Sequence, residues 1–136
     1  MINRGGNYTG SLSNDKAYRF AADNNFEIVV PDDYELQIDL DSEEEYQYFL
    51  KQLKIVKRYM PIEGEPKIKP SRHGLPKRHA TVRLTEKVSQ IERICLQACL
   101  GSDRVRELLC YFRVKVCNEA IATLFFEPKE RVSGQD

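Results

Sequence analysis

Hydrophobic and polar residues alternate along residues 34–40, YELQIDL. Tyr34, Leu36, Ile38 and Leu40 would share one face of a strand, with the polar residues on the other face, so the segment is predicted to be a half-buried strand. The preceding segment 26–30, FEIVV, is rich in β-branched residues and is closed by Pro31. It is predicted to be a second, short strand.

The period changes to that of a helix in residues 41–60, DSEEEYQYFLKQLKIVKRYM. Apolar residues recur there every three or four positions, which predicts an amphipathic helix. Its apolar positions are Tyr46, Phe49, Leu50, Leu53 and Val56. Ser42 and Glu45 have the spacing of a capping box at its start, and Pro61 and Gly64 are expected to end it.

The second half of the chain also contains patterns typical of strands and helices. Residues 67–85 are predicted to form two short strands around a Gly/Pro turn. Residues 86–100 form a second predicted helix, whose apolar positions are Val88, Ile91, Cys95, Ala98 and Cys99. Gly101 breaks this helix, and Ser102-Asp103 opens another short one. Residues 111–116 and 122–127 are predicted strands.

The two ends of the chain differ from the middle. Residues 1–24 are mostly polar and are predicted to be an N-terminal arm with one helical turn at 14–22. The tail 129–136 is predicted to be frayed. We therefore expect a single domain over residues 25–128. From residue 34 its predicted order is β-α-β-β-α-β, which indicates an α+β, RNA-recognition-motif-like antiparallel sheet with two helices on one face.

Composition indicates an ordinary globular protein. The chain has 136 residues, of which 31% are charged and 41% are apolar. No apolar run approaches the 18 or more residues of a transmembrane helix, and we expect no signal peptide. The four cysteines include no C-x-x-C pair, so they are interpreted as small buried side chains in a reducing cytoplasm rather than zinc ligands.

Charge is balanced overall but unevenly distributed. Residues 1–50 contain 11 acidic and 3 basic residues, whereas residues 51–83 contain 2 acidic and 10 basic ones. An acidic cluster beside a basic stretch suits a site that holds cations and receives phosphates. The same charges could also be solvated surface.

Two carboxylates, Asp39 and Asp41, stand at the end of the predicted strand 34–40. Residues two apart in a strand point the same way, roughly 7 Å apart, so this pair could flank divalent metal ions. The competing interpretation is that Asp41 simply favours the start of the following helix.

A basic stretch and a third acidic residue extend the candidate site. Lys77, Arg78 and His79 follow the Gly/Pro turn and could grip a triphosphate or a nucleic-acid backbone. Asp103 could be a third metal ligand, with Arg104 and Arg106 contacting phosphates. Asp103 could equally be a helix N-cap, and His79 a surface histidine.

In combination these motifs resemble the archaeo-eukaryotic primase (primase-polymerase) superfamily, in the form of a minimal phage or mobile-element member. The resemblance rests on Asp39-Leu40-Asp41, on His79 after a glycine-bearing turn, and on Asp103 followed by arginine. Lys77 occupies the position where the family usually has serine. The family core is a modified RNA-recognition-motif fold.

The resemblance implies a nucleotidyltransferase that acts on nucleic acid and nucleoside triphosphates with Mg²⁺ or Mn²⁺. It implies Asp39, Asp41 and Asp103 as catalytic metal ligands and His79 as a catalytic contact to the triphosphate. The phosphate- or nucleic-acid-binding candidates are Lys77, Arg78, Arg104 and Arg113. Three other functions remain open: a non-catalytic nucleic-acid-binding module, a metal-dependent nuclease, and a phage protein that binds a host partner.

Overall fold

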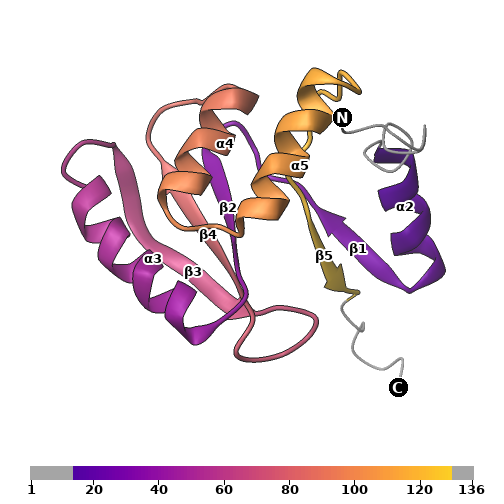
Figure 1. Cartoon of the computed structure of the whole chain (residues 1–136), viewed down its shortest axis with the longest axis horizontal. Coiled ribbons are helices and arrows are strands. Elements are labelled where there is room, and N and C mark those ends of the chain that lie inside the picture. The colour runs from indigo at the N-terminus through magenta and orange to yellow at the C-terminus, as the bar shows by residue number, and fades with distance from the viewer. Residues whose placement is uncertain (1–13, 130–136) are drawn as a thin grey trace.

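The computed structural model describes residues 14–129, which fold into four helices and two antiparallel sheets (Figure 1). In chain order the elements are α2 (Asn14–Asp23), β1 (Phe26–Val29), β2 (Glu35–Leu40), α3 (Glu43–Val56), β3 (Ile62–Pro70), β4 (Arg78–Leu84), α4 (Gln90–Cys99), α5 (Arg104–Lys115) and β5 (Phe125–Pro128). The α+β class predicted from the sequence is confirmed. The N-terminal half of the predicted arm and nearly all of the predicted tail lie outside the described residues.

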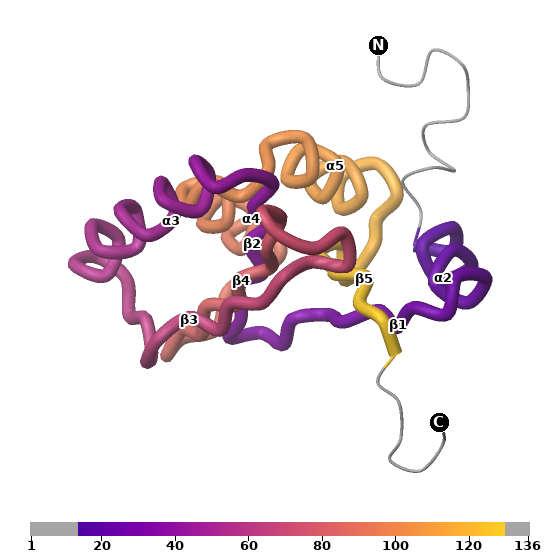
Figure 2. Tube along the Cα trace, turned by 90° about the horizontal axis from the view of Figure 1, so that it is seen from below, coloured from indigo at the N-terminus to yellow at the C-terminus, as the bar shows by residue number. Residues whose placement is uncertain are grey.

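The larger sheet has the strand order β2-β4-β3. Leu36, Ile38 and Leu40 are fully buried, as the predicted apolar face requires. They pack with Phe49 and Leu53 of α3 in the main hydrophobic core. The predicted polar face is wrong in part, because Gln37 is also buried, at 2% exposed. Figure 2 shows α3, α4 and α5 on one side of this sheet.

The second sheet pairs β1 with β5, Val29 opposite Phe125. The sequence predicted one sheet that included the last strand, whereas the structure divides the strands between two sheets. The sheets are joined where the Gln37 amide donates to the Val29 carbonyl at 3.0 Å.

The edge of β2 that faces away from β4 is already hydrogen-bonded, which explains why β5 does not pair there. Its outward N–H groups donate to oxygens of other segments: Glu35 N–H to the Asp32 carbonyl (3.1 Å), Gln37 N–H to the Gln97 side chain (2.8 Å) and Asp39 N–H to the Ser102 hydroxyl (2.9 Å). Its outward carbonyls accept from nitrogens of other segments: Glu35 C=O from the Arg93 side chain (2.9 Å), Gln37 C=O from the Arg106 side chain (2.6 Å) and Asp39 C=O from Asp103 N–H (2.8 Å). Buried backbone groups need such partners. Groups from α4, α5 and two connecting loops thus take the place of a strand.

One predicted element is wrong in type. Residues 111–116 are not a strand, because α5 continues to Lys115. Glu107 and Cys110, which lie on one face of α5, are buried, and this packing overrides the local β propensity. The helical turn predicted at 14–22 is helical as expected, and it is a full ten-residue helix, α2.

The buried face of α4 also differs from the prediction. Arg93, Ile94 and Gln97 are buried, whereas Cys95 and Cys99 are exposed. The apolar stripe assigned from sequence therefore points to solvent along most of its length. The reason is that Arg93 and Gln97 bond the edge of β2, which turns the helix around its axis. Of the four cysteines, only Cys110 is the buried side chain that was expected.

The helix starts are fixed by side-chain caps. Ser42 caps α3 by accepting from Glu45 N–H at 3.1 Å, but the Glu45 carboxylate accepts from Asp41 N–H instead of closing the predicted box. The complete capping box belongs to α4, between Ser89 and Glu92. Gly101 ends that region with a positive φ of 87°, as its predicted breaking role requires.

Membrane insertion finds no support in the helices. Among residues 14–129, no helix is both long enough and apolar enough to cross a bilayer.

Candidate metal and phosphate site

Three carboxylates meet beside the end of β2. Asp39, Asp41 and Asp103 each offer an oxygen, and these oxygens lie within 4.8 Å of one another. We call this set the acid triad. The sequence predicted all three as metal ligands, and the structure brings them together, although Asp103 is distant from the other two along the chain.

The connection between α4 and α5 places Asp103. Its backbone N–H donates to the Asp39 carbonyl, and the buried Ser102 hydroxyl accepts from Asp39 N–H. The Asp103 side chain also caps α5 by accepting from Arg106 N–H at 3.3 Å. The capping interpretation of Asp103 is therefore confirmed, and cap and triad membership are compatible because a carboxylate has two oxygens.

Burial dominates the electrostatics of Asp39. Loss of hydration raises the pKa of Asp39 to about 6. The Arg106 guanidinium opposes this shift, while the carboxylates of Asp41, Asp103 and Glu107 add to it. The triad thus concentrates negative charge in a partly buried place. A bound cation would stabilise the ionised carboxylates there.

His79 lies beside the triad beneath an aromatic ring. It faces Asp39 across the β2–β4 pair, and its Nε2 is 3.9 Å from the Asp39 carboxylate. Phe125 stacks on the imidazole with ring centroids 3.7 Å apart and an interplanar angle of 2°. Burial holds the pKa of His79 below its usual value, although the Glu127 carboxylate opposes this shift. His79 is therefore neutral at pH 7 and is buried, not a surface histidine.

A cavity of about 290 Å³, the triad cavity, opens on this side of the sheet. Its charged lining comprises the carboxylates Asp39 and Asp41 and the cations Arg72, Lys77, Arg106 and Arg113. His73, His79 and Phe125 also line it. Basic groups outnumber acidic ones, so the cavity favours an anionic ligand next to the acid triad.

The predicted basic residues are distributed over three places. Lys77 and Arg113 line the triad cavity. Arg78 does not, because it pairs with Glu43 at 2.9 Å and lies over the Tyr46 ring. Arg104 lines a second cavity, which Asp103 also lines.

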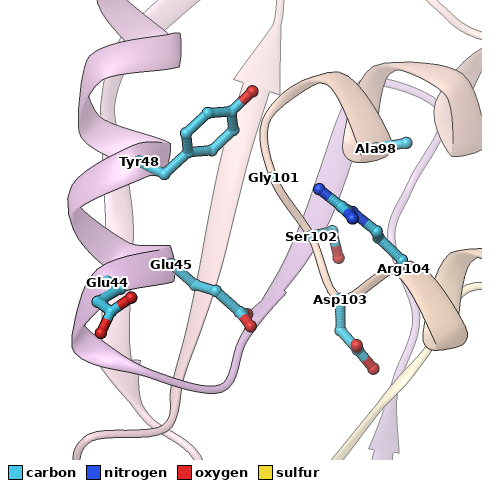
Figure 3. Close-up of a pocket in the computed structure, with 8 residues that line it drawn as sticks. All are labelled: Glu44, Glu45, Tyr48, Ala98, Gly101, Ser102, Asp103 and Arg104. Carbon is cyan, nitrogen blue, oxygen red and sulfur yellow. The ribbon is translucent and has the colours of Figure 1, made fainter.

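The second cavity, the helix cavity, has a volume of about 420 Å³ and lies between α3 and the α4–α5 connection (Figure 3). Its charged lining reverses the balance of the first, with Glu44, Glu45 and Asp103 against Arg104 alone. Tyr48 of α3 reaches into the same space in Figure 3.

Arg72 and Phe125 are among the cavity residues that were not chosen as site residues from the sequence. Arg72 lies in the turn before β4, with its guanidinium 5.2 Å from the centre of the Phe26 ring. Phe125 is the ring that stacks on His79. The basic turn was a usable signal for Arg72, whereas nothing local indicates that Phe125 reaches β4.

Comparisons with known proteins return no match: no family model fits the chain, and neither a curated protein nor a solved structure resembles it significantly.

Proposed function

We propose that this protein is a minimal primase-polymerase-like nucleotidyltransferase that acts on nucleic acid with Mg²⁺ or Mn²⁺. The observation that carries the proposal is the convergence of Asp39, Asp41 and Asp103, from separate parts of the chain, next to a cationic cavity. Phosphoryl-transfer enzymes need both features, because metal ions must meet a polyphosphate.

The triad suits a hard divalent cation. All three donors are carboxylates, the ligand type that Mg²⁺ and Mn²⁺ prefer. The mutual repulsion that helps to raise the pKa of Asp39 would be relieved by a cation. When bound, the metal would lower the pKa of an attacking hydroxyl and neutralise charge on the transferred phosphorus and the leaving pyrophosphate.

The chain's own cations have separate roles in this proposal. Lys77, Arg72 and Arg113 line the cavity and would contact the phosphates. Arg106 bonds the Gln37 carbonyl and Glu107, so it holds the site together. His79 lies opposite Asp39 on β4, with its Nε2 3.9 Å from the Asp39 carboxylate. Its predicted contact to the triphosphate stays a prediction.

The fold gives partial support to the family resemblance. The strand order β2-β4-β3, with α3 between β2 and β3 and α4 after β4, is compatible with an RNA-recognition-motif-like core. The triad cavity has a surplus of cations in its lining, and nucleic acid would approach there.

A second candidate is a non-catalytic nucleic-acid-binding module. The surplus of cations in the triad cavity favours it, because phosphate contacts alone give affinity without catalysis. The two candidates differ in whether the acid triad has a use.

Mn²⁺ titration separates the two candidates. Metal that binds only the folded state raises stability by mass action, so millimolar Mn²⁺ should raise the Tm of the wild type by about 5 °C. Asp39→Asn should abolish the rise, and Asp33→Asn, at an exposed acid away from the triad, should keep it. With Mn²⁺, nucleoside triphosphates and a primed single-stranded template, we expect primer extension by the wild type and none by Asp39→Asn.

A wild type whose Tm is indifferent to Mn²⁺ and Mg²⁺ would overturn the enzymatic proposal. Salt-dependent binding of single-stranded nucleic acid in that case would assign the protein to the binding-module class.

A further inference from the structure

We propose that the helix cavity is a nucleobase subsite, which receives the base of a nucleotide whose phosphates lie in the triad cavity. This inference rests on the proposed function and specifies where the uncharged part of the substrate lies.

The first argument is the arrangement of Tyr48. This side chain is 51% exposed, and its ring lies directly over Gly101. A Cβ atom at Gly101 would come within 2.6 Å of the ring, so the absence of a side chain there permits the contact. The ring is thus supported by backbone while much of its surface stays open, as a stacking platform for a base requires.

The second argument is that a long-range hydrogen bond holds the two walls of this cavity together. Gln52, one turn beyond Tyr48 on α3, donates to the Cys99 carbonyl at 3.0 Å and ties α3 to the end of α4. Arg104 and Tyr48 extend into the same space from opposite sides (Figure 3). A planar guanidinium can stack on a base or bond its acceptor atoms.

The third argument is charge. The helix cavity has three carboxylates and one guanidinium, so it disfavours phosphates but suits a neutral base and sugar hydroxyls. The triad cavity has the opposite balance. A nucleotide has the same division, with a polyphosphate at one end and a base at the other.

The fourth argument is that the acid triad joins the two cavities. Asp103 belongs to the triad and lines the helix cavity. Glu45 also lines the helix cavity, and its carboxylate accepts from Asp41 N–H at 2.9 Å. A ligand anchored at the triad therefore has the helix cavity next to it.

Calorimetric titration with Mn²⁺ present tests the subsite, using ATP and, as a ligand without a base, inorganic tripolyphosphate. Tyr48→Ala should weaken ATP binding about tenfold and leave tripolyphosphate binding unchanged. Tyr48→Phe should bind ATP like the wild type, because the ring remains. The matched control is Tyr59→Ala, since Tyr59 is 81% exposed and lies outside the cavity.

A short single-stranded oligodeoxynucleotide tests whether the base can also come from a strand. Weaker binding of ATP alone by Tyr48→Ala assigns the subsite to the free nucleotide, and weaker binding of the oligonucleotide alone assigns it to a strand end.

The outcomes that overturn the inference are distinct from failure of the proposed function. Unchanged affinity of Tyr48→Ala for both ATP and oligonucleotide, or an equal loss for ATP and tripolyphosphate, would remove the subsite and leave the triad proposal standing. A wild type that binds neither ATP nor tripolyphosphate with Mn²⁺ would overturn the proposed function, and the subsite with it.

Discussion

At the scale of single residues, Asp39 occupies an environment that favours its neutral form. Its pKa rises from 3.8 to about 6 because burial removes hydration from the carboxylate. A carboxyl group whose pKa is raised by folding contributes stability below its unfolded pKa, and this contribution is lost as the pH rises through the folded pKa. Above pH 6, in the absence of metal, ionised Asp39 therefore destabilises the fold.

Asp39→Asn should show this pH dependence. Without metal, the variant should be more stable than the wild type by about 1–3 kcal/mol at pH 7.5, and the difference should shrink towards zero near pH 4. Urea unfolding at both pH values, with a chelator present, measures it. The same stability difference at the two pH values would contradict the origin assigned to the effect.

Gly101 combines a positive φ with a close approach to Tyr48. Gly101→Ala should lower the free energy of unfolding by about 2–3 kcal/mol, through left-handed backbone strain and displacement of the ring. Gly64→Ala is the matched control, because Gly64 has a φ of +69° but nothing within 4 Å of a Cβ atom. It should cost about 1 kcal/mol. Equal losses in thermal or urea unfolding would show that the ring contact has no energetic weight.

At the scale of elements, the edge of β2 depends on polar side chains of the helices. Gln97 is fully buried, accepts from Gln37 N–H and donates to the Glu107 carboxylate at 2.8 Å. Its removal would leave a buried amide and a buried carboxylate each short of a partner. Such groups are costly, because nothing replaces the water that they lost on folding.

Gln97→Leu should therefore lower the free energy of unfolding by about 2–4 kcal/mol. The control is Gln47→Leu, at an exposed glutamine of α3 that bonds only Glu43 within its own helix, which should change stability by less than about 0.5 kcal/mol. Urea denaturation followed by circular dichroism compares the two. A Gln97→Leu variant as stable as the wild type would mean that β2 does not need these partners.

At the scale of the whole molecule, acidic and cationic groups from distant segments are brought to one side of the larger sheet. Lys77 comes from the turn before β4, Arg113 from α5 and the acid triad from β2 and the α4–α5 connection. Phosphate binding at such a surface releases counterions from nucleic acid, so affinity falls as the salt concentration rises.

Single-stranded DNA should bind with this salt dependence, and Lys77→Ala should reduce the slope of log affinity against log salt by about 0.7. Lys54→Ala should leave the slope unchanged, because Lys54 is exposed on α3 away from the cavity. Fluorescence anisotropy over a series of salt concentrations measures both. An affinity independent of ionic strength would exclude nucleic acid as a partner of this surface.

The sequence by itself determined the local elements and part of the site. Periodicity fixed β2 and α3, and the two-residue repeat of a strand placed Asp39 and Asp41 at its end. These features depend on neighbours along the chain, which is why they can be predicted from pattern alone. Asp103 was a correct candidate for the triad, but only its role as a cap follows from local chemistry.

Tertiary structure decided the rest. Arg93 and Gln97 look like surface residues in the sequence, yet they bond the edge of β2 and turn α4 away from its predicted stripe. Arg106 of α5 bonds the same edge, and β5 pairs with β1. Long-range hydrogen bonding also brings Asp103 to Asp39. No local pattern encodes these contacts, because each forms only when a buried backbone group must find a partner that is distant in sequence.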